Sequence, residues 1–165
     1  MKYRLAAKLL WNPAREERAL VQDFLWGHYG KAAPALVDYE ALLQQAKTEN
    51  ATTLAKPPGG IRYPMDTALL TKDFVTRGTA LFASARELAA SDPVLRQRVE
   101  RAELPLLCVQ CVRGPEFTGE SYAHVVAEFE RIARREGVRC LQEGGPDFDA
   151  KLAEFQRRIP AAKSQ

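Results

Sequence analysis

The sequence contains little of the material from which catalytic and metal sites are usually built. Only two histidines, His28 and His124, occur among 165 residues, and neither forms a His-x-x-x-His or Glu-x-x-His pair. A histidine general base or a metal centre is therefore not expected. The three cysteines, an odd number, do not make a disulfide framework. They are typical of a reducing compartment or of one part of a larger protein.

Long apolar runs and a strong excess of one charge are also missing. No apolar segment approaches the roughly 20 residues of a membrane-spanning helix, and the N-terminus lacks the basic–apolar–small order of a signal peptide. Lys and Arg exceed Asp and Glu by only three, 24 against 21, which is too little to predict a polyanionic partner. We therefore expect a cytoplasmic chain with no signal peptide and with neither a membrane nor a nucleic acid as partner.

What the sequence does contain is helical periodicity along almost its whole length. Apolar residues recur at intervals of three and four, with Gly30 at an expected helix end and Thr71 and Asp92-Pro93 at expected helix starts. The helix that opens at Asp92-Pro93 should carry an apolar seam close to that of a coiled coil, formed by Leu95, Val99, Ala102, Leu106 and Val109. We predict an all-α bundle of about six to seven amphipathic helices. These helices should form a single domain over residues 1–160, followed by a disordered tail at 161–165.

The first two helices have the clearest predicted boundary. Leu5, Leu9 and Leu10 share one face of a first helix that should end at Trp11. Asn12-Pro13 then supplies a capping side chain and a proline suited to a first helical turn, so the second helix is expected to begin at residue 13. A third amphipathic helix is expected over residues 32–47, which would complete a helical hairpin with the second.

Two segments interrupt the helical pattern. Residues 48–70 contain the sequence PPGG at 57–60 and a further Tyr63-Pro64 pair, which exclude a helix interior and disfavour a central strand. Loops longer than about 12–15 residues are uncommon in compact domains and usually have a function or move, so this Pro/Gly-rich loop is of mechanistic interest. The second segment, residues 138–141, is the one credible strand.

The side chains that could take part in redox chemistry, metal binding or nucleic-acid binding have simpler structural explanations. Cys108 and Cys111 form a C-x-x-C pair, but they lie late in a predicted helix, whereas a redox pair needs a helix N-terminus. Cys140 alone does not complete a structural zinc site. The basic run between Arg131 and Arg139 is interleaved with glutamates at helix-pairing distances, which favours a solvated, salt-bridged face. We therefore predict no catalytic, cofactor-binding or metal-binding residue in this chain.

A resemblance to a known family takes the interpretation further. AKLLWNP at residues 7–13 and FLWGHYGKAAPAL at 24–36 resemble the motif A-K-L-L-W-(N/D)-P…F…Y-Y-G-x-A-A-P of the bacterial domain-of-unknown-function family 4838. Members of that family look like glycoside hydrolases with a TIM barrel, similar to the alpha-glucuronidase and hexosaminidase groups. The resemblance extends over roughly residues 5–140 and includes the sequence RAELPL at 101–106. The chain departs from the family at His28-Tyr29, where an aromatic pair is usual.

The resemblance implies a part of a larger carbohydrate-active protein. A TIM barrel needs about 250 residues and carries its catalytic groups at strand ends, and none of those strands is present in this sequence. The chain would then be a non-catalytic, C-terminal helical module that packs against the absent barrel. Its partner-facing residues are expected to be Leu5, Leu9, Leu10 and Trp11. Without the barrel, this apolar face is expected to self-associate as a homodimer.

A second function class remains open. The chain could be an autonomous helical module that binds a protein or a carbohydrate through the 48–70 loop and the aromatic residues Trp26, Tyr29 and Tyr63. Aromatic residues at helical spacing are more often part of a core than of a sugar-binding platform, so the sequence favours the structural module.

Overall fold

The computed structural model describes residues 2–12, 14–50, 67, 69–118, 121–142 and 145–160, with backbone only for residues 2–6. The elements are α1 (Lys2–Trp11), α2 (Glu17–Tyr29), the 3-10 turn η1 (Gly30–Ala32), α3 (Ala33–Glu49), α5 (Lys72–Leu88), α6 (Pro93–Arg113), α7 (Pro115–Thr118), α8 (Tyr122–Arg135) and α9 (Phe148–Arg157). Seven of these α-helices have ten residues or more, and the described ranges contain no strand. The predicted all-α bundle is confirmed.

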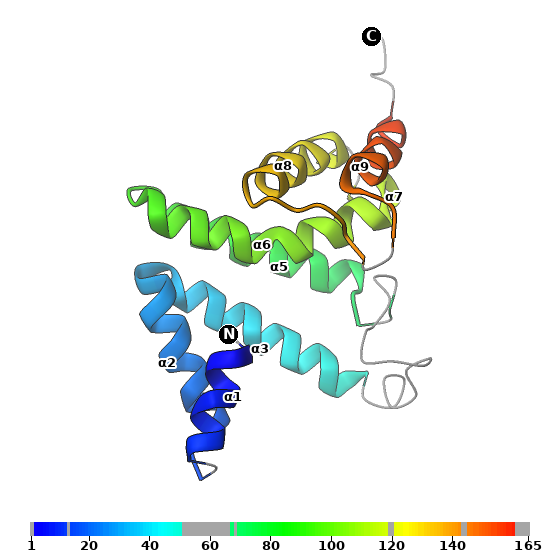
Figure 1. Cartoon of the computed structure of the whole chain (residues 1–165). Helices are drawn as coiled ribbons and strands as arrows, with labels where there is room; N and C mark the ends of the chain where they lie inside the picture. Colours follow the sequence, from blue (N-terminus) through cyan, green and yellow to red (C-terminus); the bar gives the residue numbers. More distant parts are fainter. Residues whose placement is uncertain are drawn as a thin grey trace.

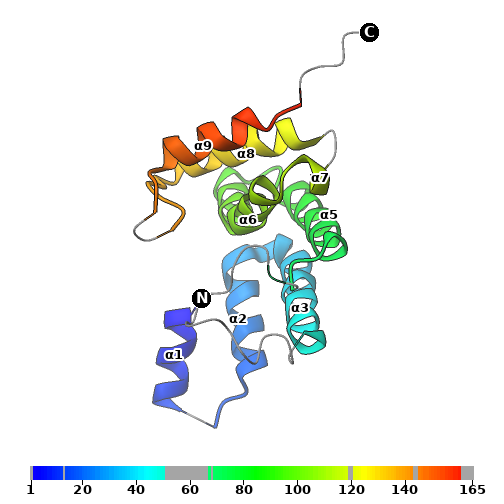
Figure 2. The same cartoon turned by 90° about the vertical axis from the view of Figure 1, so that its right-hand side faces the viewer.

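The long helix α6 is the centre of the molecule and is shared by two layers (Figure 1). Figure 2 shows α8 and α9 side by side across one face of α6, α5 beside α6, and α2 and α3 on the side of α6 away from α8 and α9. Figure 2 also shows α1 and α3 on opposite sides of α2. Each layer has its own cluster of buried side chains, and both clusters include residues of α6.

The first core lies between α2, α3, α5 and α6. Leu36 of α3 and Phe82 of α5 are buried there with the predicted apolar seam of α6, of which Val99 and Leu106 are parts. Gly78 lets α5 approach closely, because a Cβ at this position would lie 3.1 Å from the Tyr39 ring and 3.2 Å from Leu106. The sequence periodicity of α6 is thus explained by this core.

The second core lies between α6, α8 and α9. Phe129 of α8 packs against Phe148 and Phe155 of α9, with ring centroids 5.9 and 6.2 Å apart. Tyr122 is fully buried, and its hydroxyl donates a hydrogen bond of 3.0 Å to the Cys111 carbonyl. Because α6 contributes to this core as well, it is buried on two faces rather than one.

Side-chain caps fix several of the helix starts. The Thr71 hydroxyl accepts a hydrogen bond from the Phe74 amide at 3.1 Å, and the Asp92 carboxylate accepts from Val94 and Leu95 at 3.0 Å each. Asp147 caps α9 in the same way. The predicted starts at Thr71 and Asp92 are confirmed, and each cap satisfies amide groups that the helix itself leaves unpaired.

Three predicted boundaries need correction. Helix α2 begins at Glu17 rather than at residue 13, because the Asn12 side chain accepts from the Ala14 amide at 3.1 Å and forms a local turn. Helix α3 continues to Glu49, so the first residues of the predicted 48–70 loop are helical. Residues 138–141 form no strand but a single antiparallel bridge between Cys140 and Asp147. Residues 51–66, at the centre of the predicted loop, and the tail 161–165 lie outside the described residues.

Candidate interaction surface

The end of α1 presents two large apolar side chains to solvent. Leu10 is 84% exposed and Trp11 is 92% exposed, while Leu9 is half-buried. The side chain of Leu5 lies outside the described residues. Helix α1 is held beside α2 by an ion pair of 2.8 Å between Lys8 and Asp23. We refer to Leu10 and Trp11 together as the α1 edge.

A groove of about 530 Å³ runs between α2 and α3. Val21 and Leu25 of α2 and Val37 and Ala41 of α3 form its apolar lining. Three glutamates also line it, together with the cation of Arg18; these are Glu16, Glu17 and Glu40. Its volume lies within the range of roughly 300–1,000 Å³ that is usual for binding pockets. We refer to it as the α2/α3 groove.

The α1 edge and the α2/α3 groove are neighbours along the chain. Arg15 shares a shallow hollow with Trp11, and Glu16, the next residue, already lines the groove. The turn between α1 and α2 therefore joins an exposed apolar edge, one exposed cation and an acidic groove. The prediction named the apolar residues of α1, but the groove depends on how α2 and α3 pack and was not predicted.

The aromatic residues of the alternative binding surface are only partly brought together. Trp26 is 55% exposed, whereas Tyr29 is half-buried against His28, with ring centroids 4.8 Å apart. Phe24 stacks on His28 at 5.2 Å. Tyr63 lies outside the described residues, so the three-residue aromatic surface is not tested.

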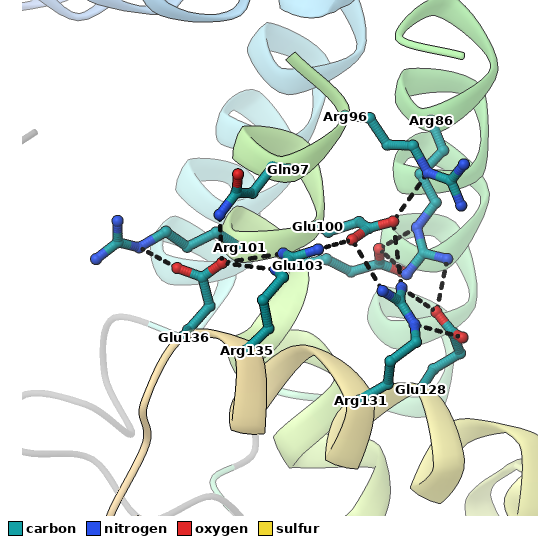
Figure 3. A network of polar contacts seen from close by, with 10 residues as sticks. All are labelled: Arg86, Arg96, Gln97, Glu100, Arg101, Glu103, Glu128, Arg131, Arg135 and Glu136. Atoms are coloured by element: carbon teal, nitrogen blue, oxygen red, sulfur yellow. Dashed lines mark hydrogen bonds and ion pairs between the residues drawn. The ribbon is translucent and has the colours of Figure 1, made fainter. Parts of the chain in front are cut away.

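A network of charged side chains joins α5, α6 and α8, as Figure 3 shows. At its centre is Glu100, which is 1% exposed. Its carboxylate accepts from Arg96 at 3.0 Å, from Arg131 at 3.2 Å and from Arg135. Burial alone raises the pKa of Glu100, but the hydrogen bonds from these three arginines outweigh it and lower the pKa to about 2.

A second carboxylate of the network lies one turn further along α6. Glu103 is 5% exposed and pairs with Arg86 of α5 at 2.6 Å, while Arg86 also contacts Glu128 of α8 at 3.2 Å. Burial raises the pKa of Glu103 despite the Arg86 charge. The prediction of a solvated, salt-bridged face located Arg131 and Arg135 correctly in ion pairs but missed that their partner Glu100 is buried. Every carboxylate named here has an arginine partner, which favours a structural clamp over a catalytic pair.

The cysteines of the C-x-x-C pair are part of the second core. Cys108 and Cys111 are both buried, and neither belongs to a disulfide. Burial raises the pKa of the Cys108 thiol to about 11 and that of Cys111 to about 12. A redox-active cysteine has a lowered pKa, so this environment favours inert core thiols.

The described part of the chain also bears on metal binding and on membrane insertion. Among the described residues, no group of three or more His, Cys, Asp and Glu side chains is arranged to hold a metal ion. No described helix combines the length and the apolar character that a membrane span requires.

One family model matches part of the chain. Residues 1–41 match the family described as "Domain of unknown function (DUF4838)". The matched segment contains α1, α2 and the first half of α3, and so the α1 edge and most of the groove lining. No curated protein and no solved structure matches the chain. The predicted relationship to this family is therefore supported over residues 1–41, and the resemblance of the later helices stays a prediction.

Proposed function

We propose that this chain is a non-catalytic helical module that packs, through the α1 edge, against the barrel of a glycoside-hydrolase-like protein. In that arrangement it is the C-terminal helical part of a carbohydrate-active protein, and it covers part of the barrel surface. The observation that carries the proposal is the pair Leu10 and Trp11, which are 84% and 92% exposed within the segment that matches DUF4838. Monomeric soluble proteins rarely leave such an apolar patch uncovered, and a packed partner removes it from water.

Binding to a barrel tests this proposal directly. The glycoside-hydrolase-like barrel of a protein that matches the same family would be titrated with this chain in a calorimeter. We expect binding that Trp11→Glu weakens by about tenfold or more, because a large aromatic anchor is replaced by a charge. Ala127→Glu, an exposed position on α8, is the matched control and should bind as the wild type does. Equal binding by wild type and Trp11→Glu would contradict docking through α1.

The non-catalytic half of the proposal has its own assay. Purified chain would be incubated with aryl glycosides and aryl glucuronides, and turnover would be followed by release of the aryl alcohol. We expect no turnover that scales with protein concentration, since a glycosidase needs two carboxylates across a cleft and the buried ones here are paired with arginines. Turnover proportional to the chain, after contaminants are removed, would overturn it.

A second candidate function is an autonomous protein- or carbohydrate-binding module that uses the 48–70 loop. The exposed Trp26 favours it, because an exposed aromatic ring can stack on a sugar face. The chain has two tryptophans, so Trp11→Phe leaves Trp26 as the only one. A saturable change in Trp26 fluorescence with soluble oligosaccharides would support this function over the first.

A further inference from the structure

We infer that the α2/α3 groove is a docking site for the α1 edge of a second copy of this chain. In such a dimer, Leu10 and Trp11 of each copy enter the groove of the other. The inference goes beyond the barrel proposal, because it assigns a role to the α2/α3 groove as well as to the α1 edge. It predicts what covers the α1 edge when no barrel is bound.

The groove is suited to an apolar anchor. Its lining of Val21, Leu25, Val37 and Ala41 offers apolar contacts, and its volume of about 530 Å³ leaves room for a large aromatic side chain. Trp11 is the more exposed of the two α1-edge side chains. Tryptophan is enriched among the residues that dominate binding energy at interfaces, because it buries a large area with little loss of conformational freedom.

The charges of the two surfaces are complementary. The groove is lined by Glu16, Glu17 and Glu40, with Arg18 as its single cation. Helix α1 has the sequence KYRLAAKLLW, which contains no acidic residue. Its Lys8 is already paired with Asp23 of the same chain, and the exposed Arg15, which shares a hollow with Trp11, is the described cation beside the anchor. A basic, apolar segment is thus matched to an acidic groove with an apolar lining, which favours this pairing over a basic or neutral partner surface.

A chain cannot fill its own groove in this way. Asp23, which holds α1 through Lys8, is two residues from both Val21 and Leu25, a rotation of roughly 200° around the helix. Helix α1 therefore packs on the side of α2 opposite to α3, as Figure 2 shows. The α1 edge and the groove are nevertheless joined by one short turn. A two-fold axis near that turn therefore places the α1 edge of each copy at the groove of the other copy. Such an interface is self-complementary and closed.

Sedimentation velocity over a range of concentrations tests the inference with the chain as it is. We expect a reversible dimer for the wild type. Trp11→Glu and Ala41→Arg should each weaken it by about tenfold or more, the first by removing the anchor and the second by placing a bulky cation in the groove. Both positions are exposed, and arginine is a good helix former, so the fold should be retained. Ala127→Arg, on the exposed face of α8, is the matched control and should dimerise as the wild type does.

Mixing the two variants tests whether the α1 edge of one copy enters the groove of the other. A heterodimer of Trp11→Glu with Ala41→Arg keeps one intact anchor in one intact groove and pairs Glu with Arg at the other site. The mixture should therefore dimerise more strongly than either variant alone. A wild type that stays monomeric at all concentrations would overturn the inference. So would an Ala41→Arg variant that dimerises normally, since the two α1 edges would then contact each other rather than the groove.

Disulfide trapping gives a second measurement, which reports on which residues lie close together in the dimer. In a Cys140→Ser background, which removes the exposed native thiol, chains with Trp11→Cys and Ala41→Cys would be mixed and oxidised. We expect a cross-linked heterodimer from this pair and none from Trp11→Cys mixed with Ala127→Cys. Equal cross-linking of both mixtures would show non-specific collision and contradict the groove as the docking site.

Discussion

At the scale of single residues, Glu100 is a buried carboxylate whose negative charge is balanced by three arginines. Replacing it by glutamine leaves Arg96, Arg131 and Arg135 without their shared acceptor. We expect Glu100→Gln to lower the free energy of unfolding by about 2–3 kcal/mol in urea titrations at pH 7, since the arginines regain some solvation. Glu130→Gln, which removes a pair with the half-exposed Arg134, is the control and should lower the stability far less than Glu100→Gln does, because water screens an exposed pair.

The same carboxylate gives a pH dependence with a defined sign. The pKa of Glu100 falls from an ordinary 4.5 to about 2 in the folded chain, so its contribution to stability is fully present above pH 4.5. That contribution is lost as the pH falls from 4.5 towards 2. The difference in unfolding free energy between wild type and Glu100→Gln should therefore shrink over this range, because the other carboxylates titrate in both proteins. A difference that stays constant between pH 5 and pH 2.5, roughly the ends of the titration, would contradict the shifted pKa.

Gly114 is a position where both the backbone and the neighbouring atoms restrict substitution. It ends α6 with φ at 84°, and a Cβ there would collide with the guanidinium of Arg158, which donates to the Val112 carbonyl at 2.9 Å. We expect Gly114→Ala to lower the free energy of unfolding by about 2 kcal/mol, measured in urea. Gly27→Ala is the control: its Cβ would meet nothing within 4 Å inside α2, so it should stabilise the fold by about 0.5–1 kcal/mol.

At the scale of elements, the sequence periodicity of α6 predicts one of its two buried faces and not the other. Leu95, Val99, Leu106 and Val109 were predicted as an apolar seam and are buried in the first core. Leu107 and Cys111 face the second core and interrupt a one-sided pattern. A helix buried on two faces lacks the contrast between one apolar and one polar face from which helical periodicity is recognised. The second buried face of α6 could therefore not be predicted from its own sequence.

For the candidate site as well, the sequence predicts the features that depend on neighbouring residues and not those that depend on how helices pack. The apolar residues of α1 and the caps at Thr71 and Asp92 depend on near neighbours in the chain, and local patterns identify them. The groove and the burial of Glu100 require helices to be docked, α3 on α2 and α8 on α6. The position of Glu100 next to Val99 of the apolar seam was the one sequence feature that could have indicated its burial. An acidic residue in a basic, amphipathic region is usually solvated, so that position alone does not predict it.

The cysteines of α6 provide a prediction at this scale. Cys108 and Cys111 lie in the second core, and we expect the double alanine variant to lower the free energy of unfolding by a few kcal/mol at most, about 1–2 per sulfur removed. Any binding to a barrel or a second copy should be unchanged, because both surfaces lie on the other layer. Stoichiometric zinc by elemental analysis, or a disulfide that cycles with mild reductants, would contradict the assignment as core thiols.

At the scale of the whole molecule, two hydrophobic cores share one helix. The first core cannot remain closed without α6, and the second core needs the other face of the same helix. The ion pairs of Arg86 with Glu103 and Glu128 also connect the layers across α5, α6 and α8. Elements coupled in this way are expected to unfold together, as the predicted single domain over residues 1–160 requires.

The two layers can be probed separately, which makes this coupling measurable. Leu36 is buried in the first core and Leu152 in the second, and each change to alanine should cost about 2–4 kcal/mol. Trp26 of α2 is 55% exposed and follows Leu25 of the first core, so in a Trp11→Phe background its fluorescence reports on the first layer, whereas circular dichroism reports on all helices. If the layers are coupled, Leu152→Ala shifts the fluorescence transition of the distant first layer as far as the dichroism transition. A variant whose dichroism falls early while its tryptophan transition stays at the wild-type position would instead show that α8 and α9 unfold as a separate unit.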